Sequence, residues 1–104
     1  MDDCIFCKII NKDIPAEIVF ESDQVICFKD INPKAKVHLL VIPKKHIPTI
    51  NDLANEDRGL ISELIFTAKE IANKIGLSNG YKLVFNVGKG GGQEVFHIHL
   101  HILG

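Results

Sequence analysis

The fold prediction starts from one stretch near the end of the sequence, Phe96-His97-Ile98-His99-Leu100-His101-Ile102-Leu103, in which histidines and apolar residues alternate. Successive side chains of a β-strand point to opposite faces of a sheet, so this alternation predicts a strand, which we extend over residues 95–103. His97, His99 and His101 would share one face, and the apolar residues the other. Three histidines in register on one face favour a functional site over three unrelated structural histidines.

Outward from this strand, the sequence predicts one long helix and four more strands. Residues 55–75 carry apolar side chains at helical spacing, with Asn55 or Asp57 able to cap the start and Gly76 able to end the helix. The predicted order is a short helix within residues 4–10 that Pro15 ends, strands at 18–20, 25–28 and 37–42 with Pro43 stopping the third, the long helix, and strands at 81–87 and 95–103. This order predicts an α+β fold with a mainly antiparallel five-stranded sheet, one long helix and a short N-terminal helix.

The composition fits a single globular domain spanning residues 1–104. Of the 104 residues, 46% are hydrophobic and 24% are charged, and the formal net charge is -1. A nearly neutral chain offers no basic surface for duplex nucleic acid, and no apolar run approaches the ~20 residues of a membrane span. The start, Met1-Asp2-Asp3-Cys4, is acidic rather than basic, so we expect no secretory signal and a cytoplasmic protein.

The predicted histidine strand limits what a metal ion could do there. In an extended strand His97 and His101 are ~13 Å apart along the backbone, so one ion with zinc–nitrogen bonds of ~2 Å cannot bind all three histidines. At least one imidazole is then free to act as a nucleophile or to move protons near neutral pH. The glycine-rich loop at residues 88–92 precedes this strand, and its backbone amides could approach a phosphate beside the histidines.

With these residues assembled, the chain resembles the histidine-triad (HIT) family, and within it the branch of histidine-triad nucleotide-binding proteins. The family pattern is His-φ-His-φ-His-φ-φ, where φ is apolar, and residues 97–103 match it without a mismatch. Further blocks of resemblance cover nearly the whole chain: Lys8-Ile9-Ile10, Ile14-Pro15-Ala16, Phe28-Lys29-Asp30-Ile31, residues 38–46 and Gly92-Gln93. The resemblance implies a HIT-like fold and a homodimer formed through the long helix and a sheet strand, which would also cover apolar surface that a chain of this size cannot easily bury.

The resemblance also implies a reaction, which is hydrolysis or transfer at the α-phosphate of a purine nucleotide phosphoramidate or related nucleotidyl ester. His99 would attack phosphorus and form a covalent nucleotidyl-histidine, from which water releases a nucleoside monophosphate. The backbone carbonyl of His97 would orient His99, and His101 would contact phosphate and protonate the leaving group. His38 would support the triad or have a purely structural role. No cofactor is needed for this chemistry. The alternatives are a nucleotide-binding regulatory module with little turnover and a metal-storage domain that uses the histidine strand.

A purine nucleotide pocket is a further implication of the resemblance. Its apolar walls would be Ile5, Phe6, Ile9, Phe28, Ile31 and Leu40. Asp30 would accept hydrogen bonds from the ribose hydroxyls. The phosphate oxygens would bind Asn86 and the backbone of Gly92, Gln93 and Glu94. From the residues alone, the six apolar side chains read better as core, and Asp30 reads equally as a turn cap. Glu94 departs from the serine that is frequent at this position, and a carboxylate repels phosphate, so the leaving group stays open.

The cysteines point to a metal site. Cys4 and Cys7 form a C-x-x-C motif, which outside a βαβ unit reads as half of a tetrahedral zinc site rather than as a redox pair. Two reduced cysteines at the start of a helix are the plainer alternative, and Cys27 reads as a small buried hydrophobe. The resemblance supplies the other two ligands, His46 and His97, because some members of the family carry a structural zinc.

Overall fold

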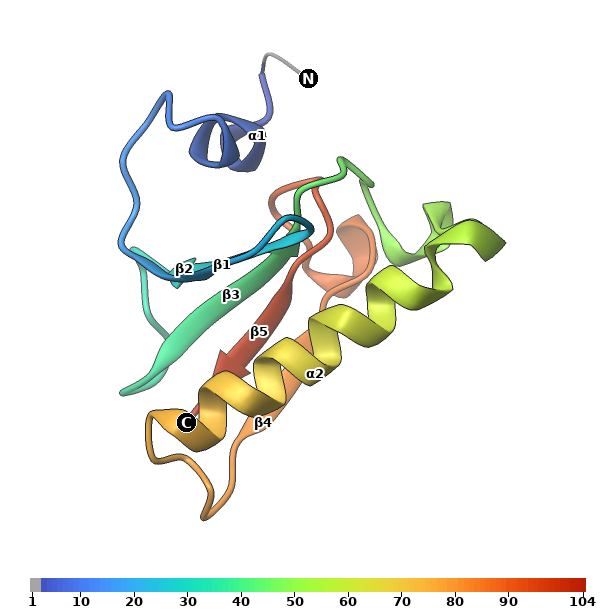
Figure 1. Cartoon of the computed structure of the whole chain (residues 1–104). Coiled ribbons are helices and arrows are strands. Elements are labelled where there is room, and N and C mark those ends of the chain that lie inside the picture. Colours follow the sequence, from blue (N-terminus) through green and yellow to red (C-terminus); the bar gives the residue numbers. More distant parts are fainter. Residues whose placement is uncertain (1–2) are drawn as a thin grey trace.

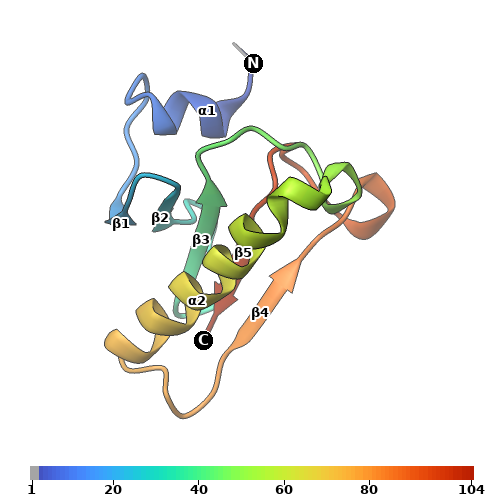
Figure 2. The same ribbon diagram turned by 45° about the vertical axis from the view of Figure 1, so that its right-hand side comes forward.

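A computed structural model describes residues 3–104; Met1 and Asp2, which begin the acidic start of the chain, lie outside the described residues. The elements are α1 (Ile5–Ile10), β1 (Ile18–Glu21), β2 (Val25–Lys29), β3 (His38–Pro43), η1 (Ile50–Asp52), η2 (Asn55–Asp57), α2 (Arg58–Lys74), β4 (Lys82–Phe85), η3 (Lys89–Gly91) and β5 (Leu100–Leu103). The strands form one antiparallel sheet in the order β1-β2-β3-β5-β4, along which α2 runs (Figures 1 and 2). The predicted α+β class, with five strands, one long helix and a short N-terminal helix, is confirmed. None of the helices within residues 3–104 is long and apolar enough to cross a bilayer.

The sheet separates two apolar clusters, because neighbouring residues of each strand point to opposite faces. Val25, Cys27 and Val41 pack on the α2 face, against Leu64 and Ala68 of the helix. The second cluster, on the α1 face, comprises Phe6, Ile9, Ile26, Phe28, Leu40 and Ile42. The short α1 covers only part of its face, and a pocket lies beside it.

The long helix begins after residues 55–57, which form a separate 3-10 turn rather than its first turn. Asp57 precedes the helix as predicted, but its carboxylate accepts the N–H of Ala54 (2.9 Å) and binds Nζ of Lys45 (2.7 Å) instead of capping the first turn. The predicted end is confirmed, because Gly76 adopts φ 92°, a left-handed value that glycine tolerates best.

The histidine strand is shorter than predicted, and this is the main correction to the expected fold. β5 starts after His97 and His99, which lie in an irregular segment. The N–H of Ile98 donates to the carbonyl of Ile47, 2.7 Å away, in place of a partner in the sheet. The alternation therefore does not continue through this segment, and Phe96, which was expected on the apolar face, is 44% exposed.

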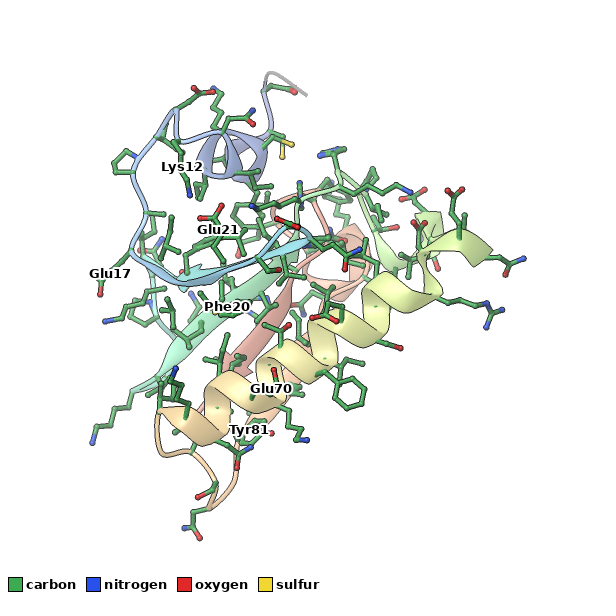
Figure 3. All side chains as sticks on the ribbon, viewed as in Figure 1. Lys12, Glu17, Phe20, Glu21, Glu70 and Tyr81 are labelled. Atoms are coloured by element: carbon green, nitrogen blue, oxygen red, sulfur yellow. The ribbon has the colours of Figure 1, made fainter. Side chains whose placement is uncertain are left out.

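Three other boundaries also differ from the prediction. The strand expected at 81–87 covers only residues 82–85, and β3 includes Pro43 as its last residue. The first helix ends at Ile10, well before Pro15, because Lys12 turns the chain with a φ of 65°. Nζ of Lys12 then binds the carboxylate of Glu21 on β1, 2.7 Å away, and the two side chains face each other in Figure 3. This ion pair ties the segment after α1 to the edge of the sheet.

Candidate functional site

A pocket of about 780 Å³ opens on the α1 face of the sheet. This volume lies within the range of small-molecule sites. The predicted site residues that line it are Ile5, Phe6, Ile9, Phe28, Asp30, Ile31, His38, Leu40, Asn86, Gly92, Glu94, His99 and His101. His97 and Gln93 are not among the lining residues. Lys82 and Val84 line the pocket but were missed, although the pairing of Val84 with His101 follows from simple alternation along β4.

One end of the pocket is apolar and open. Phe6 and Phe28 meet edge to face, with ring centroids 5.4 Å apart, and form its floor. Ile31 at the rim is 86% exposed and Ile5 is 46% exposed. Apolar side chains that surround an open pocket favour a ligand with a flat apolar group.

His99 lies where this apolar end meets the histidines. Its Nδ1–H donates to the carbonyl oxygen of His97, 2.8 Å away, so Nε2 carries the lone pair of the neutral ring. The ring is almost fully buried, packs edge to face on Phe6 at 5.2 Å, and lies 4.9 Å from the ring of His101. Burial lowers its pKa below the usual 6.5, against the opposing effects of the His97 carbonyl, Asp30 and Glu94. The ring is therefore neutral near pH 7.

A backbone amide sets the tautomers of the next two histidines. The N–H of Lys34 donates to Nδ1 of His38 at 3.0 Å, so the proton of the neutral His38 ring is on Nε2. His38 Nε2 lies 2.8 Å from Nδ1 of His101 and donates to it. His101 then carries its own proton on Nε2. Burial, followed by the charges of His99 and His38, lowers the pKa of His101 to about 4.

Asp30 has a turn-holding role as well as a place in the pocket. One carboxylate oxygen accepts the N–H of Asn32 at 2.8 Å, and the other lies 3.4 Å from Nε2 of His38. Asp30, His38 and His101 are close enough to hold a metal ion, but hydrogen bonds already use these atoms. We therefore interpret the three as a hydrogen-bonded chain.

The glycine-rich loop satisfies most of its own amides. The N–H of Gly92 donates to the carbonyl of Lys89 (3.1 Å), and the N–H of Gln93 donates to that of Gly88 (3.0 Å). Asn86 donates from Nδ2 to the carbonyl of Gly91 at 2.9 Å. The first two amides are thus not free for phosphate, which leaves the second N–H of the Asn86 side chain as a loop donor near the histidines.

A second site lies behind the pocket, where Cys4, Cys7, His46 and His97 bring four ligand atoms within 4.8 Å of one another. Nδ1 of His97 is 3.5 Å from Sγ of Cys4, 3.7 Å from Sγ of Cys7 and 3.1 Å from Nδ1 of His46. Bonds of ~2.0 Å to nitrogen and ~2.3 Å to sulfur give edges of about 3.3–3.8 Å in a tetrahedral zinc site. The four residues are thus positioned to bind a metal, and their geometry and donor types fit zinc.

His97 belongs to this second site rather than to the pocket. Its side chain is fully buried, and Nε2–H donates to the carbonyl of Pro43 at 2.8 Å, which directs the Nδ1 lone pair toward the cysteines. Burial lowers the pKa of His97 to about 4, so the ring is neutral and able to ligate. Burial and the neighbouring Cys4 raise the pKa of Cys7 to about 11, and a metal ion has to displace that proton.

Three known proteins and one family model resemble the chain over nearly all of its length. The family model described as DcpS_C, scavenger mRNA decapping enzyme C-term binding, matches residues 3–104. Protein HitA of Neisseria gonorrhoeae is 52% identical over 104 residues, which are 100% of this chain and 97% of that protein. A HIT family hydrolase from Legionella pneumophila shares 54% identity at a TM-score of 0.96, covering 98% of this chain and 92% of its own. A histidine triad nucleotide-binding protein from Candida albicans superposes at a TM-score of 0.87 with 31% identity, over 96% of this chain and 73% of its own.

Proposed function

Because the chain belongs to the histidine-triad (HIT) family, we propose that it is a purine nucleotide-binding hydrolase or transferase. Its substrate is a nucleoside phosphoramidate or related nucleotidyl ester, cleaved at the α-phosphate, and its product is a nucleoside monophosphate. The similar protein from Legionella is called a hydrolase, and the one from Candida a nucleotide-binding protein.

The observation that carries this proposal is the state of His99. Its Nδ1–H is held by the carbonyl of His97, its ring lines the pocket, and burial keeps it neutral. A neutral imidazole with one nitrogen fixed and the other free is the group that covalent transfer through histidine requires.

In the first step, Nε2 of His99 attacks the α-phosphorus and the bond from phosphorus to the leaving group breaks. The bound phosphate is an anion, so it favours one extra proton on the His38–His101 pair. His101 Nε2 passes this proton to the departing amine or alcohol, which leaves neutral. The product is a nucleotidyl group on His99, whose ring is cationic because Nδ1 keeps its proton on the His97 carbonyl.

In the second step, water attacks the same phosphorus from the position that the leaving group has left. Nε2 of His101 accepts a proton from this water, and the phosphorus–nitrogen bond to His99 breaks. The cationic ring is a good leaving group and becomes neutral as the bond breaks. The nucleoside monophosphate departs, and the extra proton on the histidine pair returns to solvent.

The remaining pocket residues have binding roles in this proposal. The base lies between the apolar side chains of Ile5, Phe6, Ile9, Phe28, Ile31 and Leu40. Asp30 accepts hydrogen bonds from the ribose while its other contacts hold the turn. Asn86 donates to a phosphate oxygen, together with the backbone at Gly92–Glu94, of which the internal bonds of the loop leave Glu94 the best placed.

We further propose that the ion held by Cys4, Cys7, His46 and His97 is zinc and that its role is structural. The ion would join the N-terminal segment to the chain just before β5, and it would hold His97, whose carbonyl orients His99. The reaction itself needs no metal. A site of this kind also requires reduced thiols, which agrees with the cytoplasmic location expected from the sequence.

A homodimer is the last part of the proposal. β4 is an edge strand, and Leu83 on it is 38% exposed (Figure 2). On α2, Phe66 is 57% exposed and Ile65 43% exposed. A second copy that pairs along β4 and packs on α2 would satisfy the open strand edge and cover these apolar side chains.

The direct test is incubation with an AMP phosphoramidate, with detection of AMP and of an adenylyl adduct after an alkaline denaturing quench. We expect turnover by the wild type and a loss of about 10⁴-fold or more in His99→Ala, because that variant lacks the attacking nitrogen. AMP titration and circular dichroism serve as controls that the variant still folds and binds. AMP binding without turnover or adduct in the wild type would instead establish the regulatory-module alternative.

A further inference from the structure

The strand order arranges the pocket from an apolar end to a polar end. Phe28 on β2 pairs with Leu40 on β3, and Leu40 pairs with His101 on β5. His101 in turn pairs with Val84 on β4, the last strand. A nucleotide with its base against Phe28 and Leu40 and its α-phosphate at the histidines therefore directs its leaving group toward β4 and the loop that follows it.

Glu94 lines the pocket at this polar end, and its neighbour holds it there. Gln93 is buried, its backbone N–H donates to the carbonyl of Gly88 at 3.0 Å, and its Nε2 donates to the carbonyl of Pro48 at 2.7 Å. Because adjacent residues of an extended segment point in opposite directions, the anchoring of Gln93 keeps Glu94 on the pocket side.

The carboxylate of Glu94 is also free of partners. Within residues 3–104 it takes part in no ion pair and no side-chain hydrogen bond. Asp30, the other acidic residue of the pocket, instead uses both of its oxygens in contacts with Asn32 and His38. The charge of Glu94 acts on His99, whose pKa it raises, which places this charge near the reacting centre.

We propose that Glu94 selects leaving groups that carry a positive charge, such as an amine bearing a second ammonium group, over leaving groups that carry a negative charge. The inference rests on the proposed function, because it specifies the leaving group of that reaction. An unpaired carboxylate ~6 Å from a charge at a partly exposed site changes the rate by roughly tenfold, with opposite signs for cations and anions. Lys82, a cation on β4, pairs with Leu103, two positions beyond His101, and so lies farther along the strand from His99.

The test uses three AMP phosphoramidates whose amines have nearly equal length, formed with putrescine (cationic), pentylamine (neutral) and δ-aminovalerate (anionic). We would measure kcat/KM for the wild type, Glu94→Gln and the control Glu56→Gln, whose side chain is 78% exposed and outside the pocket. In the wild type we expect the cationic conjugate to react fastest and the anionic one slowest, with steps of about tenfold at low salt. Glu94→Gln should remove most of this order and Glu56→Gln none of it.

Two outcomes separate this inference from the proposed function. Equal rates for the three conjugates in the wild type, or an unchanged order in Glu94→Gln, would overturn the role of Glu94 and leave the reaction intact. Absence of AMP and of an adduct with every conjugate would overturn the reaction itself. Glu94→Lys, checked for folding by thermal unfolding, should reverse the order, and added salt should reduce it in the wild type.

Discussion

The hydrogen bond from Nδ1 of His99 to the carbonyl of His97 has a measurable consequence at the level of one residue. Burial lowers the pKa of His99, so the ring stays neutral at pH values where a free histidine is already protonated. The attacking form is the neutral one, and it is lost only as the pH falls through the lowered pKa. We predict that kcat/KM for an AMP phosphoramidate stays flat from pH 8 to below 6.5 and then falls.

The measurement is a kcat/KM profile across pH 4.5–8.5, since this parameter reports the ionisation of the free enzyme. Circular dichroism and metal content at each pH serve as controls, because protonation of the cysteine and histidine ligands would release an ion at low pH. A midpoint at or above 6.5, with fold and metal content retained, would contradict the interpretation that burial sets the state of this ring.

At the level of elements, the end of α2 depends on a single backbone conformation. Gly76 has φ 92°, and Leu77 beyond it donates its N–H to the carbonyl of Ala72 at 2.8 Å. An alanine at φ 92° places its Cβ against the backbone, so we predict that Gly76→Ala lowers the free energy of unfolding by about 1 kcal/mol. Chemical denaturation monitored by circular dichroism measures this change.

Gly59 provides the matched control within the same helix. It lies in the first turn of α2, and a Cβ added there meets no atom within 4 Å. Gly59→Ala should therefore raise the free energy of unfolding by about 0.5–1 kcal/mol, because alanine favours the helix. Destabilisation of similar size in both variants would show that the conformation of Gly76 is not what matters.

The metal site joins α1 to the rest of the fold, because Cys4 and Cys7 lie at the start of this helix while His97 precedes β5. We predict that the purified, untagged protein contains one zinc per chain and that chelation lowers its melting temperature by more than about 10 °C. Hydrogen exchange should then accelerate in α1 first, since the ion is the main link between α1 and the histidines.

Cys27 provides the control for this prediction. It is fully buried, and burial raises the pKa of its thiol to about 12, so it offers no thiolate to a metal. Cys7→Ser should lose the zinc, whereas Cys27→Ala should keep it. More than one zinc per chain would favour the metal-storage alternative, and an unchanged melting temperature after chelation would exclude a structural role.

The elements that could be predicted are those that local patterns determine. The β1–β2 hairpin and the body of α2 follow from alternation and helical spacing, and they are confirmed. The extent of β5 could not be predicted, because the N–H of Ile98 finds its partner in Ile47, far away in the chain. The early end of α1 depends in the same way on the left-handed Lys12, since no local pattern marked that residue.

At the scale of the whole molecule, the pocket shows the same division. The histidine pattern identified His99 and His101, which lie beside each other in the pocket. Only the family resemblance indicated that His46 would join Cys4 and Cys7. The hydrogen bond between His38 and His101 depends on the pairing of β3 with β5, which no spacing in the sequence specifies.

The last prediction concerns assembly. Phe66 on α2 is 57% exposed, and burial of a phenylalanine side chain in a symmetric interface contributes roughly 1.5–3 kcal/mol per copy. A glutamate there would instead place two charges in the apolar interface. We therefore predict that Phe66→Glu converts a dimer into a monomer at micromolar concentration, measured by light scattering after gel filtration. Phe20→Glu is the control, because Phe20 is 40% exposed on β1, the opposite edge of the sheet. A monomeric wild type would exclude the dimer, and a monomer in Phe20→Glu alone would move the interface to β1.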